Sequence, residues 1–260
     1  MIEQKEKPNL VMTEAQIPLI SIILVSLNSR KTIEQTILSI INIDYPKTEF
    51  IIIDGESSDG TTEIINKYRQ YIDQVVVEKD HGIYDAMNKG TKIARGDYFY
   101  FVGSDDVLVN SWHRLIGKLK SQNTVYYCNV YFPVSNKIYA GKFGKLKRMI
   151  RNICHQAIFY PRSIFDRYQY SDKYPMQSDF HLNILINSDP DYNFKYINLL
   201  TAIFSERGIS TTKTDSNFKK DHLEIIKKHN PFFLFLFCFI ALSISRWISK
   251  IRKSGKINIK

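Results

Sequence analysis

The run ISIILVSL, residues 20–27, decides the fold class. Six of its eight residues are apolar, and four of those six are β-branched. A run of this kind predicts a strand that is buried on both faces, as in a parallel sheet. Residues 32–43 then carry apolar side chains at helical spacing before Tyr45-Pro46, so we expect a helix that ends there.

The same alternation continues through the first hundred residues. We expect further strands at 50–53, 74–77 and 98–102, with helices at 61–71 and 83–94. Four strand–helix alternations predict half of a doubly wound α/β fold, with ligand-binding loops at the carboxyl ends of the strands. The second half is less regular, with helices expected at 111–121 and 177–187, strands at 124–132 and 194–204, and a basic loop at 142–151.

Composition and charge narrow the class of protein. With 260 residues, 44% apolar and 24% charged, the chain is globular. Its three cysteines are far apart and predict neither a disulfide framework nor a metal site, which favours a reducing compartment. Eight Lys or Arg and no acidic residue lie between 227 and 260, so the net charge of +10 falls to +2 for residues 1–226. That distribution argues against nucleic acid as a partner and for a tail that meets an anionic surface.

The basic tail is also apolar. Residues 232–244 are apolar all round, yet this stretch is short against the roughly 20 residues that a membrane-spanning helix needs. Ile244, Trp247, Ile248 and Ile251 continue as a helical apolar stripe. We therefore expect residues 231–253 to bind a membrane surface, peripherally or shallowly inserted. The alternative is an ordinary core helix in a homodimer interface.

Polar side chains follow three of the expected strands. Ser26 and Asn28 close the first strand, Asp54 closes the second, and Asp105-Asp106 follow the fourth. No Gly-x-Gly-x-x-Gly or Gly-Lys-Ser/Thr motif is present, so backbone amides are not expected to cradle phosphate. A phosphate bound here needs a divalent cation, and Mg²⁺ or Mn²⁺ suits such carboxylates.

Five motifs in order now resemble a known family. They are Tyr45-Pro46, DGESSDGT at 54–61, DHGIYDAMNKG at 80–90, Gly96-Asp97-Tyr98 and Ser104-Asp105-Asp106. Together with the first strand they are similar to family 2 glycosyltransferases of the bacterial surface-polysaccharide type. The resemblance implies a GT-A fold, which is a Rossmann-like mixed sheet with helices on both faces, here followed by a membrane-associated helical tail.

The resemblance also implies a division of the chain. Residues 1–18 would be a flexible extension, and 19–226 the GT-A domain, with a nucleotide-sugar half at 19–110 and an acceptor half at 111–226. Residues 227–260 would form the membrane-associated tail. The implied activity is inverting transfer of a sugar from a UDP- or GDP-linked donor to a glycan, carried on a polyprenyl diphosphate at the cytoplasmic side of a bacterial inner membrane.

Site roles follow from the same resemblance. Asp106 would bind the metal, Asp105 would lie near the donor ribose, and Asp179 would be the general base. His155, followed by Gln156, would lie on the acceptor or diphosphate side, and Arg207 would belong to a loop that closes over the donor. The remaining donor-binding residues would be Val25, Ser26, Asn28, Asp54 and Lys89.

Several positions depart from the family's usual pattern, and alternatives remain open. Gly55 stands where a base-contacting Asp is common, Ser104 opens the aspartate motif, and Ser178 replaces the Glu before Asp179. Asp106 and Asp179 could instead be helix caps, and His155 a buried, hydrogen-bonded core residue. A catalytically inactive membrane scaffold and a sugar nucleotidyltransferase are rival functions, although the latter needs a Gly-rich loop after the first strand.

Overall fold

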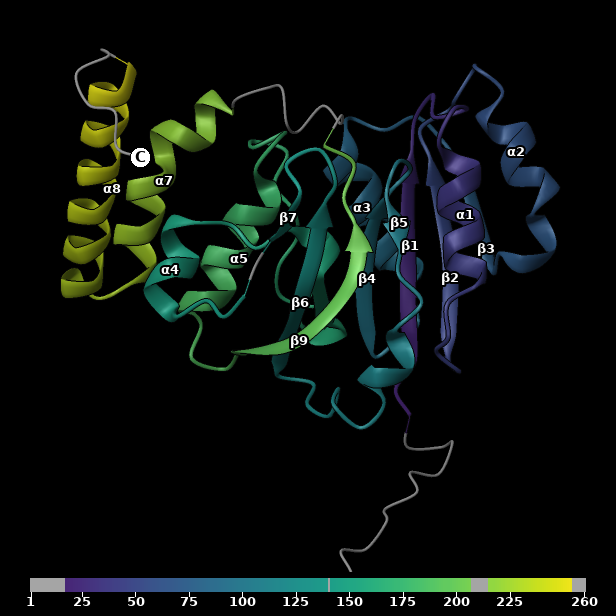
Figure 1. Cartoon of the computed structure of the whole chain (residues 1–260), viewed down its shortest axis with the longest axis horizontal. Helices are drawn as coiled ribbons and strands as arrows, with labels where there is room; N and C mark the ends of the chain where they lie inside the picture. The colour runs from purple at the N-terminus through teal and green to yellow at the C-terminus, as the bar shows by residue number, and fades with distance from the viewer. Residues whose placement is uncertain (1–16, 140, 207–214, 254–260) are drawn as a thin grey trace, which may run out of the picture.

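The computed structural model describes residues 17–139, 141–206 and 215–253. Its centre is one mixed sheet in the order β3-β2-β1-β4-β8-β6-β9-β5, with β7 paired to β6 (Figure 1). The parallel strands of the first half are β1 (Ile20–Ser26), β2 (Thr48–Asp54), β3 (Gln74–Val77) and β4 (Tyr98–Gly103). The second half adds β5 (Val107–Leu108), β6 (Thr124–Phe132), β7 (Lys137–Tyr139), β8 (Ile158–Pro161) and β9 (Asn193–Ile203).

The mixed character of the sheet begins at β8. This strand runs antiparallel to both β4 and β6, whereas β6 and β9 are parallel to each other. The helices are α1 (Ile33–Ile41), α2 (Thr61–Lys67), α3 (Ile83–Ile93), α4 (Lys145–Ile150), α5 (Ser178–Ser188), α7 (Ser216–His229) and α8 (Phe232–Lys253). The predicted α/β fold with a mixed sheet is confirmed.

The first strand is buried as its sequence predicts. Every residue of β1 is buried, and Ile22, Ile23 and Leu24 are completely inaccessible to solvent. Helix α3 packs closely over this strand, because a Cβ added to Gly90 would lie 2.5 Å from Ile23 Cγ2. Burial on both faces explains why β1 is an apolar run rather than an alternating one.

Two predictions about local structure in the second half are wrong. The helix expected at 111–121 is only a 3₁₀ turn at Trp112–Leu115, and the chain then adopts a φ of +73° at Gly117, which ends helical geometry. The basic loop expected at 142–151 contains helix α4. Met149 of that helix is fully buried in an apolar cluster, so one face of the basic segment packs against the protein.

The parallel register brings the strand ends to one edge. Ser26 at the end of β1 is paired with Asp54 at the end of β2, and Val25 with Gly103 at the end of β4. The loops that follow these strands therefore start side by side. This edge of the sheet carries the polar residues that the sequence singles out.

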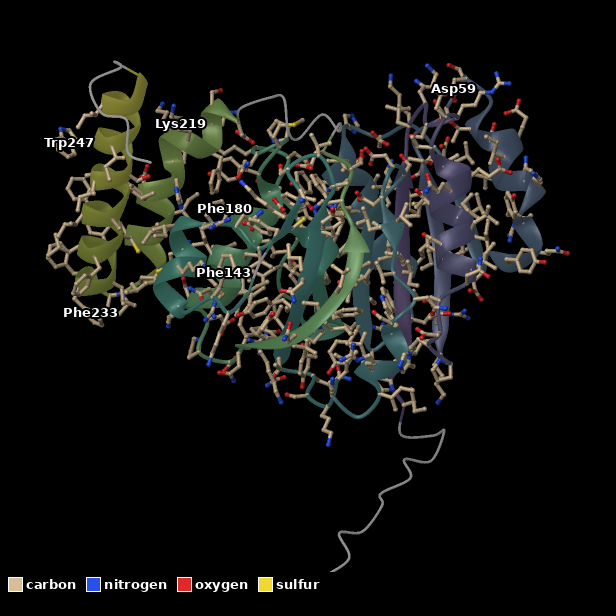
Figure 2. All side chains as sticks on the ribbon, in the orientation of Figure 1. Asp59, Phe143, Phe180, Lys219, Phe233 and Trp247 are labelled. Carbon is tan, nitrogen blue, oxygen red and sulfur yellow. The ribbon has the colours of Figure 1, made fainter. Side chains whose placement is uncertain are left out.

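Helices α4, α5, α7 and α8 form a second apolar cluster beside the sheet (Figures 1 and 2). Phe180 and Phe218 pack with ring centroids 5.1 Å apart, and Cys238 of α8 donates to Met149 Sδ at 3.7 Å. Helix α8 is thus tied to the domain by one side. Within the described residues, no helix combines the length and apolar character that crossing a membrane requires.

His181 of α5 makes folding sensitive to acid. Burial, followed by the positive charges of His229 and Lys173, lowers its pKa from 6.5 to about 4. Its folded pKa lies below its unfolded value, so its contribution to stability is complete above pH 6.5 and is lost as pH falls towards 4. We expect His181→Phe, which keeps a ring against Tyr174, to shrink the loss of stability between pH 7 and pH 5. Urea unfolding at both pH values measures this, and an unchanged difference would contradict it.

Candidate active site

Asp106 lies immediately after β4 and is almost completely buried, with 1% of its surface exposed. Its Oδ2 accepts hydrogen bonds from Gln156 Nε2 at 2.7 Å and from the Gly103 amide at 3.1 Å, and its Oδ1 accepts from the Ser205 amide at 2.9 Å. Burial and the neighbouring Asp105 charge raise the pKa of Asp106 to about 6, against the effect of these hydrogen bonds. The carboxylate thus ties the end of β4 to the segment after β9.

Asp105 differs from its neighbour. In the described part of the chain, no hydrogen bond or ion pair engages its carboxylate. A Cβ added to Gly103 would lie 3.2 Å from Asp105 Oδ1 and 3.0 Å from Asp106 Oδ2, so both carboxylates converge on this glycine. Carboxylate oxygens are ligands that suit Mg²⁺ or Mn²⁺, which complete their shells with phosphate and water. The Asp105 carboxylate is available for this role, whereas Asp106 Oδ2 already accepts two hydrogen bonds. The residues described contain no cluster of three or more His, Cys, Asp or Glu that could hold a metal alone.

Asp179 lies at the start of α5 and is 6% exposed. Its Oδ1 accepts from the Tyr84 hydroxyl at 2.9 Å and from the Phe180 amide at 2.7 Å. Its Oδ2 accepts from Asn152 Nδ2 at 2.8 Å, and His155 Nδ1 lies 3.5 Å from the same oxygen. Burial, and then the Asp179 charge, raises the pKa of Tyr84 well above 10, so its phenol stays protonated and donates. Asp179 is thus a buried carboxylate that accepts three hydrogen bonds and lies beside His155.

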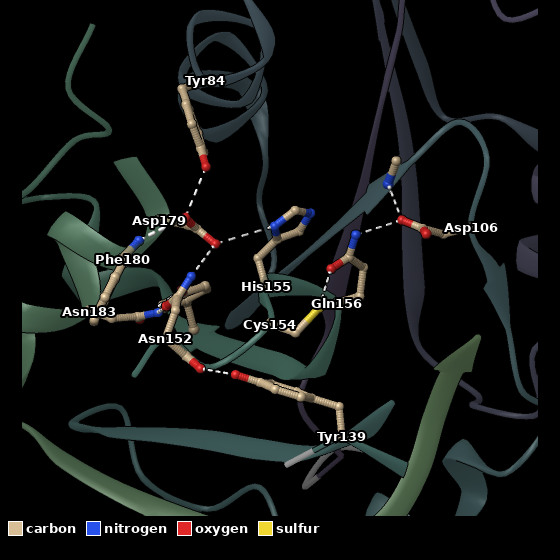
Figure 3. A network of polar contacts seen from close by, with 12 residues as sticks. Tyr84, Asp106, Tyr139, Asn152, Cys154, His155, Gln156, Asp179, Phe180 and Asn183 are labelled. Carbon is tan, nitrogen blue, oxygen red and sulfur yellow. Dashed lines mark hydrogen bonds and ion pairs between the residues drawn. The ribbon is translucent and has the colours of Figure 1, made fainter. Parts of the chain in front are cut away.

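One tripeptide connects the two carboxylates (Figure 3). Gln156 donates to Asp106, while the Cys154 thiol donates to Gln156 Oε1 at 2.7 Å. Burial raises the pKa of Cys154, which keeps the thiol protonated for this bond. Between these residues, His155 faces Asp179, and Figure 3 shows its imidazole between Asp179 and Asp106. The segment 154–156 therefore hydrogen-bonds to one carboxylate and lies beside the other.

The loops after β1 and β2 are joined by hydrogen bonds. Ser26 Oγ donates to Asp54 Oδ2 at 2.7 Å, and Ser57 Oγ donates to the same oxygen. Asn28, with a φ of +49°, accepts from the Ser58 amide through its Oδ1. Asp54 is completely buried, whereas Asn28 is exposed. The structure thus brings these predicted donor-binding residues to one edge of the sheet. There the Asp54 carboxylate stabilises the loop by accepting hydrogen bonds from Ser26 and Ser57.

The remaining predicted site residues do not all lie at this edge of the sheet. Val25, 5% exposed, lies at the same strand end as Ser26. Lys89 instead lies within a separate cluster, donating to the Lys79 carbonyl at 2.6 Å and pairing with Glu78 at 3.1 Å. Arg207 lies outside the described residues, as does most of the predicted extension 1–18.

Sequence reasoning noticed Gln156 beside His155 but missed the other side chains that hold the carboxylates. Tyr84, Asn152 and Gln156 bond to them directly, and Asn183 supports Asn152 through a bond to its Oδ1 at 2.9 Å. Tyr84 lies inside the motif at 80–90, and Gln156 directly follows His155. Both are therefore part of sequence stretches that were already singled out. Asn152 and Asn183 carry no sequence signal, because only the fold brings them to Asp179.

A mixed sheet with paired carboxylates at its loop edge suits binding of a phosphorylated sugar donor and activation of a hydroxyl. Residues 21–191 match the sequence profile of glycosyl transferase family 2. The chain belongs to this family. The predicted resemblance is confirmed, and the chain is a glycosyltransferase by family.

This glycosyltransferase is similar over most of its length to a relative from Mycobacterium bovis. The relative, a "PGL/p-HBAD biosynthesis glycosyltransferase", is 32% identical over 215 residues, which cover 78% of this chain and 83% of the relative. Two solved structures share the fold. Staphylococcus aureus TarS (residues 1–349, with UDP-GlcNAc) has a TM-score of 0.58 and 18% identity, covering 80% of this chain and 64% of that one. The mannosyltransferase PcManGT of Pyrobaculum calidifontis, with GDP-Man and Mn²⁺, has a TM-score of 0.63 and 14% identity, covering 98% and 85%.

Proposed function

We propose that this glycosyltransferase transfers a sugar, with inversion, from a nucleotide-sugar donor to a glycan acceptor. The observation that carries the proposal is the pairing of Asp106, at the end of β4, with Asp179, at the start of α5, through the segment 154–156. Glycosyl transfer needs a group near the departing diphosphate and a proton acceptor near the attacking hydroxyl. We assign Asp106 to the first of these places and Asp179 to the second.

The proposed reaction is a direct displacement. The acceptor hydroxyl attacks the anomeric carbon opposite the diphosphate, and its proton passes to the Asp179 carboxylate. General base help of this kind is worth about 10²–10⁴-fold. A Mg²⁺ or Mn²⁺ ion held by Asp106 and Asp105 would supply several kcal/mol of charge stabilisation to the departing nucleoside diphosphate. Attack opposite the leaving group inverts the configuration of the sugar.

The donor is proposed to be UDP- or GDP-linked, with Val25, Ser26, Asn28 and Asp54 on the nucleoside side. Fold relatives bound to UDP-GlcNAc and to GDP-Man with Mn²⁺ support this class of donor. The test is the melting temperature of the full-length protein with UDP, GDP, CMP or dTDP, each with and without Mn²⁺. A ligand at 100 times its Kd stabilises by about 2.7 kcal/mol. We expect a metal-dependent rise with UDP or GDP.

Rival functions predict other results. A catalytically inactive scaffold predicts no rise with any nucleotide. A sugar nucleotidyltransferase predicts that a nucleoside triphosphate stabilises the protein more than the diphosphate does. Either pattern would count against the transferase.

The acceptor is proposed to be a glycan on a polyprenyl diphosphate, at the cytoplasmic side of a bacterial inner membrane, in surface polysaccharide synthesis. Support comes from α8, which packs on the domain through Cys238 and turns a wide apolar face outward (Figure 2). At 3.6 residues per turn this face covers about half the helix circumference. Its exposed members are Phe232, Phe233, Leu236, Phe237, Phe239, Ile240, Ile244, Trp247 and Ile248.

The charge of the neighbouring chain fits an anionic membrane. Lys227 and Lys228 are exposed at the end of α7, and no acidic residue follows them through residue 260. An apolar helix face with Trp beside basic residues is suited to the boundary between lipid headgroups and acyl chains. Such a position holds the site near a lipid-borne substrate.

We expect the double change Phe233→Ser and Trp247→Ser to weaken binding to vesicles containing phosphatidylglycerol by roughly tenfold or more. Full burial of a large apolar side chain is worth about 1.5–3 kcal/mol, and 1.4 kcal/mol is tenfold in affinity. Co-sedimentation with vesicles measures the binding. The control is Val134→Ser, which changes an apolar residue of similar exposure on another part of the fold.

The homodimer alternative has its own signature. If the outward face of α8 is an interface between two copies, the wild-type protein is dimeric in sedimentation velocity without lipid, and the double variant is monomeric. That result, with vesicle binding equal for wild type and variant, would contradict membrane binding through α8.

A further inference from the structure

Two cations lie close together at the end of α4 without a carboxylate beside them. Lys147 Nζ lies 4.0 Å from the centre of the buried Phe143 ring, and the Arg151 guanidinium carbon lies 5.9 Å from the centre of the same ring. Neither side chain forms an ion pair with an acidic residue in the described part of the chain. Like charges held near each other repel, so an anion bound by both would relieve an unfavourable contact.

The neighbouring Arg148 has a different role. Its Nε donates to Asn187 Oδ1 at 2.7 Å, and its Nη1 donates to the Phe143 carbonyl at 2.6 Å. These bonds join α4 to α5 and to the loop before it. By contrast, the Lys147 ammonium donates no hydrogen bond to any described residue, and the exposed Arg151 guanidinium donates one. Most of the donors of this cation pair are therefore available to a ligand.

A short series of hydrogen bonds connects Arg151 to the candidate base. Arg151 Nε donates to the Tyr139 hydroxyl at 3.3 Å, and that hydroxyl donates to the Asn152 carbonyl (Figure 3). Asn152 Nδ2 in turn donates to Asp179 at 2.8 Å. Burial raises the pKa of Tyr139, although Arg151 acts against it, so the phenol keeps the proton that it donates. The guanidinium is thus held close to the residue that supports Asp179.

Helix α4 lies between the candidate site and the outward apolar helix. It packs against α5, which opens with Asp179, and against α8 (Figure 1). The contact with α8 is made by Met149, whose Sδ accepts from Cys238. Residues two apart on a helix point in nearly opposite directions, so Lys147 lies on the other side of α4 from Met149. The same short helix therefore carries the cation pair on one side and the proposed membrane helix on the other.

We propose that Lys147 and Arg151 bind the diphosphate of the lipid-linked acceptor. This inference rests on the transferase function proposed above and names the residues that hold its acceptor. A guanidinium suits phosphate because its planar fork donates two parallel hydrogen bonds, and a lysine ammonium adds a compact point charge. Two cations can hold a diphosphate without a metal ion. That property separates this site from the donor side, where a metal is proposed at the aspartates after β4.

Calorimetric titration with geranyl diphosphate, a short prenyl diphosphate, tests the proposal. EDTA is present so that no divalent metal recruits the probe to the donor side. We expect the full-length wild type to bind the probe and the double variant Lys147→Gln/Arg151→Gln to bind it roughly tenfold more weakly or less tightly still. The matched control, Arg114→Gln/Lys118→Gln, removes two exposed cations elsewhere and should bind as wild type does.

Two outcomes of this titration would overturn the proposal. One is equal affinity in wild type and the Lys147/Arg151 double variant. The other is an equal loss in the control, which would show an effect of net charge alone. Because Arg151 also bonds to Tyr139, the single variant Lys147→Gln guards against a folding defect. If the two cations contribute equally, it binds the probe roughly threefold more weakly than wild type, with unchanged urea unfolding.

Two further measurements separate the acceptor diphosphate from other phosphates. We expect UDP or GDP with Mn²⁺ to raise the melting temperature of the Lys147/Arg151 double variant as much as that of wild type. A smaller rise would make the pair a contact of the donor diphosphate. Weaker binding to phosphatidylglycerol vesicles, together with unchanged affinity for geranyl diphosphate, would make it a contact of lipid headgroups. Either result would overturn the proposal.

Transfer kinetics give the final check. With a polyprenyl-diphosphate-linked acceptor, the double variant should raise the KM for the acceptor roughly tenfold and leave kcat unchanged, because the lost contact is the same in the ground and transition states. A wild-type KM in the double variant, with normal transfer, would overturn the acceptor site and leave the transferase function standing. Conversely, a wild-type protein that binds geranyl diphosphate through the pair, but neither binds nor releases a nucleotide, would count against the transferase function alone.

Discussion

Asp179→Asn is expected to lower the rate of sugar transfer by about 10²–10⁴-fold, the range that general base help contributes. The side chain keeps its size, but the amide offers a donor where the carboxylate accepts from Asn152 and faces His155 Nδ1. The amide also cannot take the proton of the attacking hydroxyl. Nucleoside diphosphate release from the donor, measured at saturating donor concentration, gives the rate.

Stability must be separated from chemistry in this variant. Leaving a buried hydrogen-bonding group unsatisfied costs about 1–3 kcal/mol, so urea unfolding gives the folded fraction to which the rate is normalised. The control Asp172→Asn changes an exposed aspartate of the preceding loop and should match wild type in both measurements. A normalised rate for Asp179→Asn within a fewfold of wild type would show that the carboxylate has no part in proton transfer.

The second large effect is expected at the donor end of the site. Asp106→Asn should weaken metal-dependent binding of UDP or GDP by about ten- to a hundredfold, equivalent to about 1.5–3 kcal/mol for interactions of a charged group. Because Asp106 also anchors Gly103, Gln156 and Ser205, nucleotide binding without metal should weaken as well. Calorimetric titration with and without Mn²⁺ measures both.

Asp105→Asn is the informative comparison. Its carboxylate makes no hydrogen bond with the described residues, so this variant should lose the metal-dependent part of binding and keep the metal-free part. Asp172→Asn again serves as control. If the Mn²⁺ dependence of nucleotide binding were equal in wild type, Asp105→Asn and Asp106→Asn, neither aspartate would be a metal ligand.

The first half of the fold was predictable because its signals are local. The apolar run of β1 and the helical spacing of α3 each lie within about a dozen residues, and burial in a parallel sheet explains both. The predictions at 111–121 and 142–151 failed for two different reasons. Gly117 adopts a positive φ, which a glycine permits but does not require, and Met149 of α4 is buried against residues from distant helices, which local sequence does not show.

The candidate site was also predictable only in part. Asp106 and Asp179 belong to short motifs, so sequence reasoning reached them. The partners that determine their behaviour are remote: Tyr84 is 95 residues from Asp179, and Gln156 is 50 from Asp106. The spacing of apolar residues along the sequence does not reveal such distant contacts. The hydrogen bonds of Asp179 to Tyr84 and Asn152 became apparent only when the fold placed these side chains together.

The most direct test of the account is nucleoside diphosphate release by the full-length protein in phosphatidylglycerol vesicles that contain a polyprenyl-diphosphate-linked sugar. UDP-, GDP-, CMP- and dTDP-linked sugars are supplied in turn with Mn²⁺. The account predicts release from a UDP- or GDP-linked sugar, faster with the lipid-linked acceptor than without, and lower in Asp179→Asn by about 10²–10⁴-fold. Release that is absent with every donor, or equal in wild type and Asp179→Asn, would contradict it.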